Sequence, residues 1–139
     1  MKIEVVNKEV ALNDLEAFVN HWLEDEAPAK DKLEELYKPI LNAIVDGFLT
    51  FDEEQDPKLK LKKPIDWGGD LVGEISFAKR IKPLTLASIA KGIDLKTDPM
   101  TLQFRMVANL TNKPVAFVDS YCKYDLNVVQ AIAGIFSEL

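Results

Sequence analysis

Apolar residues recur three and four positions apart between residues 13 and 23. This spacing predicts an amphipathic helix that ends before Pro28. Asn13, followed three residues later by Glu16, has the pattern of a helix N-cap with a capping box. Residues 2–6, before this helix, have the composition of a short strand. The apolar positions of the helix are Leu15, Phe18, Val19, Trp22 and Leu23.

A second helical pattern covers residues 30–46. Pro39 lies inside it and predicts a kink or break near Lys38, because proline lacks a backbone N–H and crowds the preceding turn. Gly47 is the expected end of this helix.

The pattern changes to extended chain between residues 48 and 78. Lysine and leucine alternate strictly over Lys58–Lys62, which predicts a strand with its leucines on one face. Pro64 fits a sheet edge or a strand end, and Gly68-Gly69 lies in a turn. Beyond that turn, one face of a further strand would hold Leu71, Ile75 and Phe77. Together these features predict a two- or three-stranded antiparallel meander that helices must cover.

Helical signals return after Pro83, with a short helix that closes at Gly92. Asp98-Pro99 predicts the start of another helix. The stretch 100–110 also alternates as a strand would, and we favour a helix because the start signal and the length suit one. A further short helix is expected from Pro114 to Tyr121, followed by a final helix over 125–139.

The final helix has an unusually wide apolar face. Its polar residues form only a thin strip, whereas a surface helix normally has a narrower apolar stripe. The helix is therefore either a central core helix or one that offers part of its face to a partner or to a second subunit. The residues that would contact such a partner are Leu126, Val129, Ile132 and Phe136.

The predicted fold class is α+β, mostly helical, with the small antiparallel meander near the middle of the chain. Two parts are expected: an acidic helical lobe over 1–47, and a unit over 48–139 that packs with it. Residues 1–56 hold 15 acidic residues against 5 lysines, a balance of −10, whereas residues 57–139 hold 8 against 12 basic residues, a balance of +4. This uneven charge leaves three interpretations open. The surfaces of the two parts attract each other, one of them faces a partner, or the charges are simply distributed unevenly in contact with solvent.

Composition excludes several classes of function. The chain has 139 residues, 47% of them apolar, which suits one globular domain. Its net charge of −6 argues against general nucleic-acid binding. No apolar run approaches the ~18 residues of a membrane helix, and the beginning of the sequence does not resemble a secretion signal, so a cytoplasmic protein is expected. We expect no cofactor.

No catalytic or metal-binding group of residues is predicted. The single histidine, His21, has no second ligand nearby. The single cysteine, Cys122, is followed by Lys123 but is far from any histidine that would act as a base. Asp94 and Asp98 lack the glycine and closing glutamate of a calcium loop. The lysines of 58–62 lack interleaved aromatic residues for base stacking and are better explained as a strand face whose lysines prevent aggregation between sheet edges.

Several segments of residues 58–139 occur in the order and spacing of motifs from one family. Leu59–Ile65 is similar to an opening strand of pattern L-x-x-P-I, and Gly69 with Leu71–Phe77 is similar to the turn and second strand that follow. Lys82-Pro83-Leu84 resembles a helix entry, P-(T/K/R)-x-x-D-L. The last two are Leu110–Pro114, similar to L-T-G-x-P, and Lys123–Phe136, similar to an ending with D-(L/Y) and G-G-F.

The family that these motifs resemble is the tail assembly chaperones of long-tailed bacteriophages, of the Mu-like type. The helix-entry aspartate is absent here, the junction glycine is Asn112, and Gly134 alone remains of the final glycine pair. Residues 1–57 lie outside the resemblance.

The resemblance implies a non-enzymatic protein of the infected host cytoplasm. Such chaperones bind the long tape-measure protein and keep it soluble until tail-tube subunits assemble around it, and they are commonly absent from the finished virion. The partners implied by the resemblance are the tape-measure protein and tail-tube subunits, whereas a second copy of the chain is suggested only by the apolar face of the final helix. Alternatives are another phage structural or adaptor protein, such as a tail-completion or connector component, a small enzyme, and a nucleic-acid binder that uses the lysines of 58–63.

Overall fold

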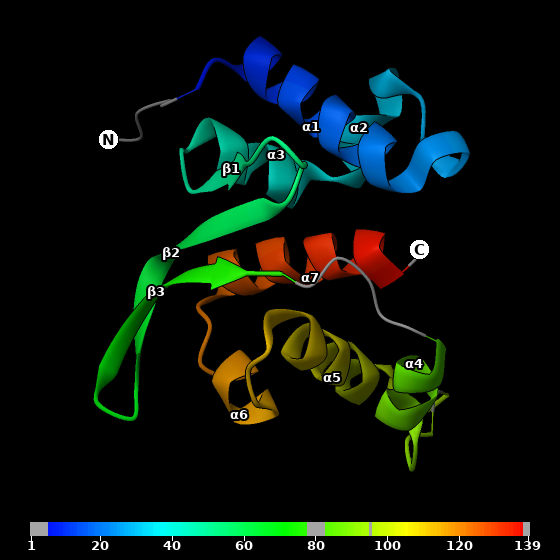
Figure 1. Ribbon diagram of the computed structural model, residues 1–139, viewed down its shortest axis with the longest axis vertical. Helices are drawn as coiled ribbons and strands as arrows, with labels where there is room; N and C mark the ends of the chain where they lie inside the picture. The colour runs from blue at the N-terminus through cyan, green and yellow to red at the C-terminus, as the bar shows by residue number, and fades with distance from the viewer. Residues whose placement is uncertain (1–5, 78–82, 95, 138–139) are drawn as a thin grey trace.

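The chain folds into an α+β structure in which helices lie on both sides of its last helix and a three-stranded sheet lies at one end (Figure 1). The computed structural model describes residues 6–77, 83–94 and 96–137. The predicted fold class and the meander near the middle of the chain are therefore confirmed. In chain order the elements are α1 (Lys8–Leu23), a 3-10 turn (Glu24–Glu26), α2 (Lys30–Leu36), α3 (Lys38–Val45), β1 (Leu49–Phe51), β2 (Pro57–Trp67), β3 (Asp70–Ser76), α4 (Pro83–Ala90), α5 (Pro99–Thr111), α6 (Val115–Val118) and α7 (Lys123–Ser137).

Helix α1 begins earlier than the sequence pattern indicated. Its N-cap is Asn7, whose side-chain oxygen accepts a hydrogen bond from the Glu9 N–H at 2.8 Å. The prediction that Asn13 is the cap is wrong, because Asn13 lies inside the helix. The earlier turn buries Ala11, and such packing stabilises a helical turn beyond its local signals. The strand expected at residues 2–6 falls almost entirely outside the described residues.

The break between the second and third helices is confirmed. Helix α2 ends at Leu36 and α3 begins at Lys38, with Tyr37 between them in a non-helical conformation. Gly47, at φ 82°, ends α3 as predicted. This left-handed residue lets the Phe48 N–H reach back to the Ala43 carbonyl at 2.9 Å, which satisfies a carbonyl at the end of the helix.

The three strands form an antiparallel meander in the order β1-β2-β3. The short strand β1 pairs only with the start of β2, where Leu49 lies opposite Leu59. The β2-β3 hairpin turns at Gly68-Gly69, both at positive φ, as predicted. The outer half of this hairpin projects from the body of the molecule (Figure 1).

An irregularity in β2 changes which side chains face the core. Lys60 pairs with Glu74 and Ile65 pairs with Val72, so residues 61–64 lie opposite Gly73 alone. The additional residues belong to β2, so β3 keeps its own alternation, whereas β2 beyond the bulge presents its side chains on the opposite faces from those that strict alternation predicts. The prediction that Leu71 is buried is wrong, because Leu71 lies in the outer half of the hairpin, away from the core, and is 73% exposed. Pro64 lies inside β2 at a sheet edge, one of the two places predicted for it, because β1 pairs only with residues 57–59 of β2.

The later helices follow the predicted order. The stretch 100–110 is helical, within α5, and Asp98 caps that helix by accepting a hydrogen bond from the Thr101 N–H at 3.3 Å. Helix α4 is followed by Gly92 at φ 78°, as expected. Helix α6 is shorter than the predicted span, because Pro114 is its N-cap and helical structure ends at Val118.

Helix α7 lies at the centre of the fold. It contacts α1, α3, α5 and β2, and in Figure 1 it lies between the group α1–α3 and the group α4–α6. One continuous cluster of buried side chains includes residues from both 1–47 and 48–139. The two predicted parts therefore share a core in the described residues.

Candidate functional site

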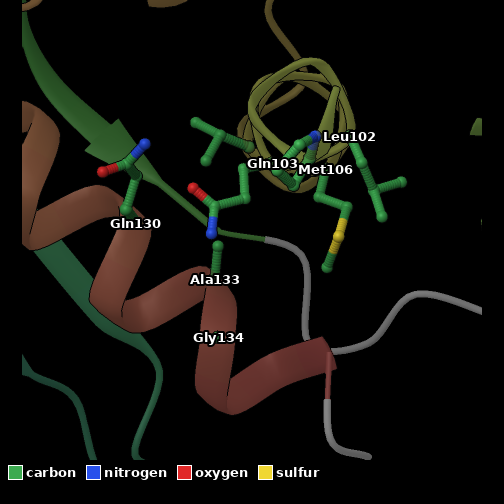
Figure 2. Close-up of a pocket in the computed structure, with 8 residues that line it drawn as sticks. Leu102, Gln103, Met106, Gln130, Ala133 and Gly134 are labelled. Atoms are coloured by element: carbon green, nitrogen blue, oxygen red, sulfur yellow. The ribbon is translucent and has the colours of Figure 1, made fainter. Parts of the chain in front are cut away.

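An apolar groove of about 290 Å³ lies between α5 and α7 (Figure 2). Eight of the residues that the structure describes line it, and none of these eight is charged, although 29% of the chain is charged. Such a lining makes the groove inexpensive to desolvate, which is typical of the centre of a protein–protein interface. The residues that shape it come from both helices: Leu102, Gln103 and Met106 from α5, and Gln130, Ala133 and Gly134 from α7.

Gly134 leaves the α7 side of the groove open. A Cβ atom built onto Gly134 would meet no atom within 4 Å, so the backbone here borders free space. Gln103 and Gln130 extend from opposite helices beside this opening (Figure 2). Their neutral amides offer both donors and acceptors to an incoming group. The groove therefore combines an apolar floor with two uncharged polar groups.

The sequence did not predict this groove. Gln130 belonged to the thin polar strip of the final helix, and Gly134 was noted only as part of a family motif. The groove depends on how α5 packs against α7, which local patterns do not encode. An exposed glycine in the middle of an apolar helix was the one signal available, because glycine weakens a helix and needs another explanation there.

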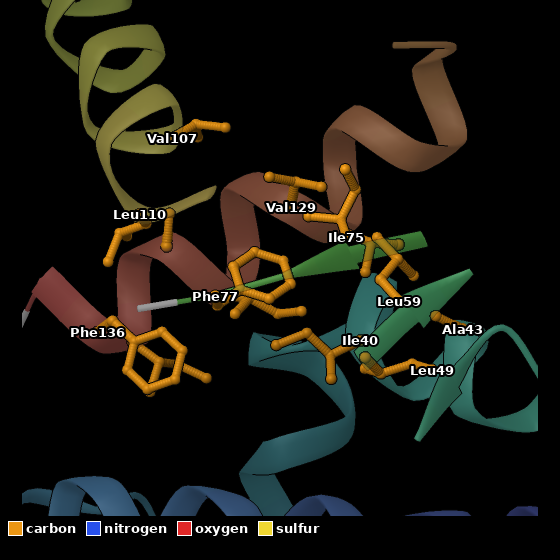
Figure 3. Close-up of a cluster of buried hydrophobic side chains, with 14 of the residues drawn as sticks. Ile40, Ala43, Leu49, Leu59, Ile75, Phe77, Val107, Leu110, Val129 and Phe136 are labelled. Carbon is orange, nitrogen blue, oxygen red and sulfur yellow. The ribbon is translucent and has the colours of Figure 1, made fainter. Parts of the chain in front are cut away.

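The residues of α7 that were predicted to contact a partner do not line this groove. Val129, Ile132 and Phe136 have no exposed surface and pack within the chain, and Leu126 is partly buried. Figure 3 shows Val129 and Phe136 among side chains from α3, the sheet and α5. Helix α7 is thus the central core helix of the two alternatives. These three side chains are not available to a partner in the folded chain, because the core already covers them.

Asp125 joins the first turn of α7 to the irregular part of β2. This carboxylate has no exposed surface. Its two oxygens accept hydrogen bonds from the backbone N–H groups of Lys62 at 2.9 Å and Lys63 at 3.1 Å. The Cys122 thiol donates to the same carboxylate at 3.2 Å. Asp125 therefore provides acceptors for two N–H groups in the segment that the bulge removes from the regular ladder, while its charge favours the N-terminus of α7.

A second polar contact ties the same turn of α7 to α3. The Tyr124 hydroxyl donates to Asp46 at 2.7 Å, and the ammonium group of Lys62 lies 4.8 Å from the centre of the Tyr124 ring. Burial, and then the hydrogen bond to Asp46, raise the pKa of Tyr124. These contacts hold α3, β2 and α7 together and are structural.

Tyr121 gives the fold a predicted sensitivity to alkali. Burial raises the pKa of Tyr121 from 10.0 to about 12, because a buried phenolate loses its hydration. The folded state thus favours the protonated phenol. The contribution of this preference to folding stability is complete below pH 10.0 and is lost as the pH rises toward about 12. We expect urea unfolding to show falling stability across that range. Tyr121→Phe should reduce the decrease of the free energy of unfolding with pH in this range. An unchanged decrease would contradict this explanation.

The remaining sequence candidates have structural roles. His21 is exposed and its ring lies against Trp22, with 4.7 Å between the ring centres. Asp94 accepts a hydrogen bond from the Lys96 N–H at 3.0 Å, as in an ordinary turn. Lys60 lies on the exposed face of β2 opposite Glu74. In the part of the chain that the structure describes, no three His, Cys, Asp or Glu side chains come together as a metal site requires.

Comparison with known proteins gives no assignment. No family model matches the chain, and no curated protein or solved structure matches it. Among residues 6–77, 83–94 and 96–137, no helix is long and apolar enough to cross a membrane. A function must therefore be argued from the sequence motifs and from the groove.

Proposed function

We propose that the protein is a non-enzymatic tail assembly chaperone of a long-tailed bacteriophage. It binds the tape-measure protein in the host cytoplasm, keeps that protein soluble until tail-tube subunits assemble around it, and is absent from the mature virion. The observation that carries the proposal is the uncharged apolar groove between α5 and α7. A long helical protein exposes apolar faces before assembly, and a helix-in-groove contact covers such faces.

The positions of the family-like motifs in the fold also support the proposal. The motif of pattern L-x-x-P-I lies in β2 and the turn at Gly69 closes the hairpin, as the resemblance implies for an opening strand and its turn. Asn112 stands where the family pattern has glycine, and it adopts the left-handed conformation at φ 54°. Asparagine is among the few residues that tolerate this conformation, so the substitution preserves the local geometry.

Co-expression with the tape-measure protein encoded beside this chain tests the proposal. We expect the tape-measure protein to be mostly insoluble alone, and to become soluble and co-purify when this chain is present. An unrelated acidic protein of similar size serves as the control. If the tape-measure protein stays insoluble, the proposal is wrong. If the chain is present in stoichiometric amounts in purified virions, it is instead a structural or adaptor component, such as a tail-completion or connector protein.

A further inference from the structure

Strand β3 is an edge of the sheet with no partner on its outer side among the described residues. The sheet order is β1-β2-β3, so β3 pairs with β2 on one side only. Outside this pairing, no backbone hydrogen bond joins β3 to another residue that the structure describes. The N–H and C=O groups on the outer side of β3 can therefore pair with a further strand.

The other edges of the sheet are short or protected. Strand β1 has only three residues. Beyond β1, the edge of β2 contains Pro64, which has no N–H, and the N–H groups of the preceding Lys62 and Lys63 are bonded to Asp125. Lysine, proline and bulges are features with which proteins prevent pairing at sheet edges. Strand β3 (Asp70–Ser76) contains neither lysine nor proline, so its edge lacks this protection.

One face of β3 is covered by the core at one end of the strand only. Leu71 and Ile75 lie on the same face, because side chains alternate along a strand. Ile75 is buried in the core, whereas Leu71 is largely exposed, in the half of the hairpin that projects from the body of the molecule (Figure 1). A neighbouring strand that covered Leu71 would remove apolar surface from water.

Two copies of β3 can pair antiparallel about a two-fold axis perpendicular to the sheet. Such an axis preserves the faces of the sheet, so residues of the same face lie opposite each other. All seven residues of β3 pair when the axis passes beside Gly73, the middle residue of the strand. Leu71 of each copy then lies opposite Ile75 of the other copy. The leucine that its own core leaves uncovered therefore meets the half of the other strand that a core supports.

The acidic residues of β3 favour this register over its neighbours. With the axis beside Val72, Asp70 would lie opposite Glu74, and with the axis beside Glu74, two Glu74 side chains would lie opposite each other. Like charges directly opposite each other destabilise a strand pair. With the axis beside Gly73, Glu74 lies opposite Val72, so no two acidic side chains are directly opposite.

We propose that the chain forms a two-fold symmetric dimer, in which β3 pairs antiparallel with β3 of a second copy and the axis passes beside Gly73. The two three-stranded sheets then join into one continuous sheet. The inference does not depend on the proposed function, because none of the described residues that line the groove between α5 and α7 belongs to β3. One strand pair is a small interface, so we expect a dissociation constant of about 10–100 μM and a monomer below about 1 μM.

Sedimentation velocity of the full chain tests the dimer. We expect the sedimentation coefficient to rise between about 1 μM and about 300 μM. Leu71→Lys places an ammonium group against Ile75 of the other copy, and should weaken dimerisation at least about tenfold. In the monomer, Asp66 lies opposite position 71 on β2, so the variant should fold. Leu36→Lys makes the same substitution at an exposed leucine of α2 and should dimerise as the unmodified chain does. Circular dichroism and thermal unfolding check that both variants are folded.

The salt dependence of the dimer separates strand pairing from attraction between opposite charges. Each copy has a net charge of −6, so two copies repel each other overall. We expect the dimer to be as strong or stronger when NaCl is raised from about 50 mM to about 500 mM, because salt screens this repulsion.

Cross-linking tests the register of the strand pair. In chains that also carry Cys122→Ser, the variants Asp70→Cys and Ser76→Cys each hold one thiol, at exposed positions that lie opposite each other in the dimer. A short bis-maleimide should cross-link a mixture of the two at least about tenfold more than either alone, because identical positions lie about 20 Å apart along the strands. Gly73→Cys should cross-link to itself, since a Cβ atom has room at this position.

The inference is wrong if the chain is monomeric at about 300 μM, if Leu71→Lys dimerises as the unmodified chain does, or if Asp70→Cys alone cross-links as well as the mixture. A dimer that high salt dissociates would overturn it in favour of attraction between the acidic residues of 1–56 and the basic residues of 57–139. If the chain stays monomeric but binds a labelled extended peptide of alternating lysine and leucine, the edge of β3 takes a strand from another protein instead of a second copy.

Discussion

Replacing Asp125 with alanine is expected to destabilise the fold by about 3 kcal/mol or more. The substitution removes both acceptors of the Lys62 and Lys63 N–H groups and leaves a cavity at a position with no exposed surface. It also removes a negative charge from the first turn of α7, where that charge favours the helix dipole. Because small domains have total stabilities of about 5–15 kcal/mol, we expect a large shift of the urea midpoint.

Two further variants separate the hydrogen bonds from the general effect of substitution. Asp125→Asn keeps one acceptor oxygen but places an amide NH₂ against the second backbone N–H, so it should lie between the native chain and the alanine variant. Asp119→Ala removes an exposed aspartate that caps the end of α6, and should change stability by less than about 0.5 kcal/mol. A loss of under about 1 kcal/mol in Asp125→Ala would show that water replaces the carboxylate without difficulty.

Phe136→Ala should cost about 3–5 kcal/mol, the usual range for a fully buried phenylalanine. Phe136 has no exposed surface. Its ring makes edge-type contacts with Phe18 and Trp22 of α1, with 6.0 Å and 5.3 Å between the ring centres. The loss therefore falls on the contact between residues 1–47 and the rest of the chain. Because the two parts share one core, we expect a single unfolding transition in the native chain and in the variant.

A double-mutant cycle measures this contact directly. Phe18→Leu and Phe136→Leu, combined, should show a coupling of about 0.5–1.5 kcal/mol, as aromatic pairs do. Leu71→Ala, at an exposed position of β3, serves as a control with an expected change below about 0.5 kcal/mol. Two separate transitions would mean that the acidic lobe folds on its own, whereas coupling near zero would mean that the Phe18–Phe136 pair does not contribute to this contact.

Local patterns were sufficient for most of the elements. The proline in 30–46, the alternation in 58–62 and the Asp98-Pro99 start signal each act within a few residues, and the structure confirms each of them. The N-cap of α1 was placed at Asn13 because Glu16, three residues later, completes the pattern of a capping box. Burial of Ala11, a tertiary effect, decides in favour of Asn7.

The errors and omissions concern features that depend on distant parts of the chain. Alternation along β3 indicates a face for Leu71, but this part of the hairpin projects from the body of the molecule (Figure 1), so no core covers that face and Leu71 is 73% exposed. Asp125 lies in the first turn of α7, but its hydrogen-bond partners lie 62 and 63 residues earlier in the chain. The groove requires the packing of α5 against α7. None of these relations leaves a periodic signal in the sequence.

The central position of α7 has a consequence for how the protein is made. A ribosome synthesises α1 to α6 and the sheet before α7, yet α1, α3, α5 and β2 all pack against α7. Until residues 123–137 have left the ribosome, the earlier elements lack the surface that joins them, and their apolar faces stay exposed. Folding of this core is therefore completed only after its last helix has been translated, and the growing chain itself passes through a stage that is prone to aggregation.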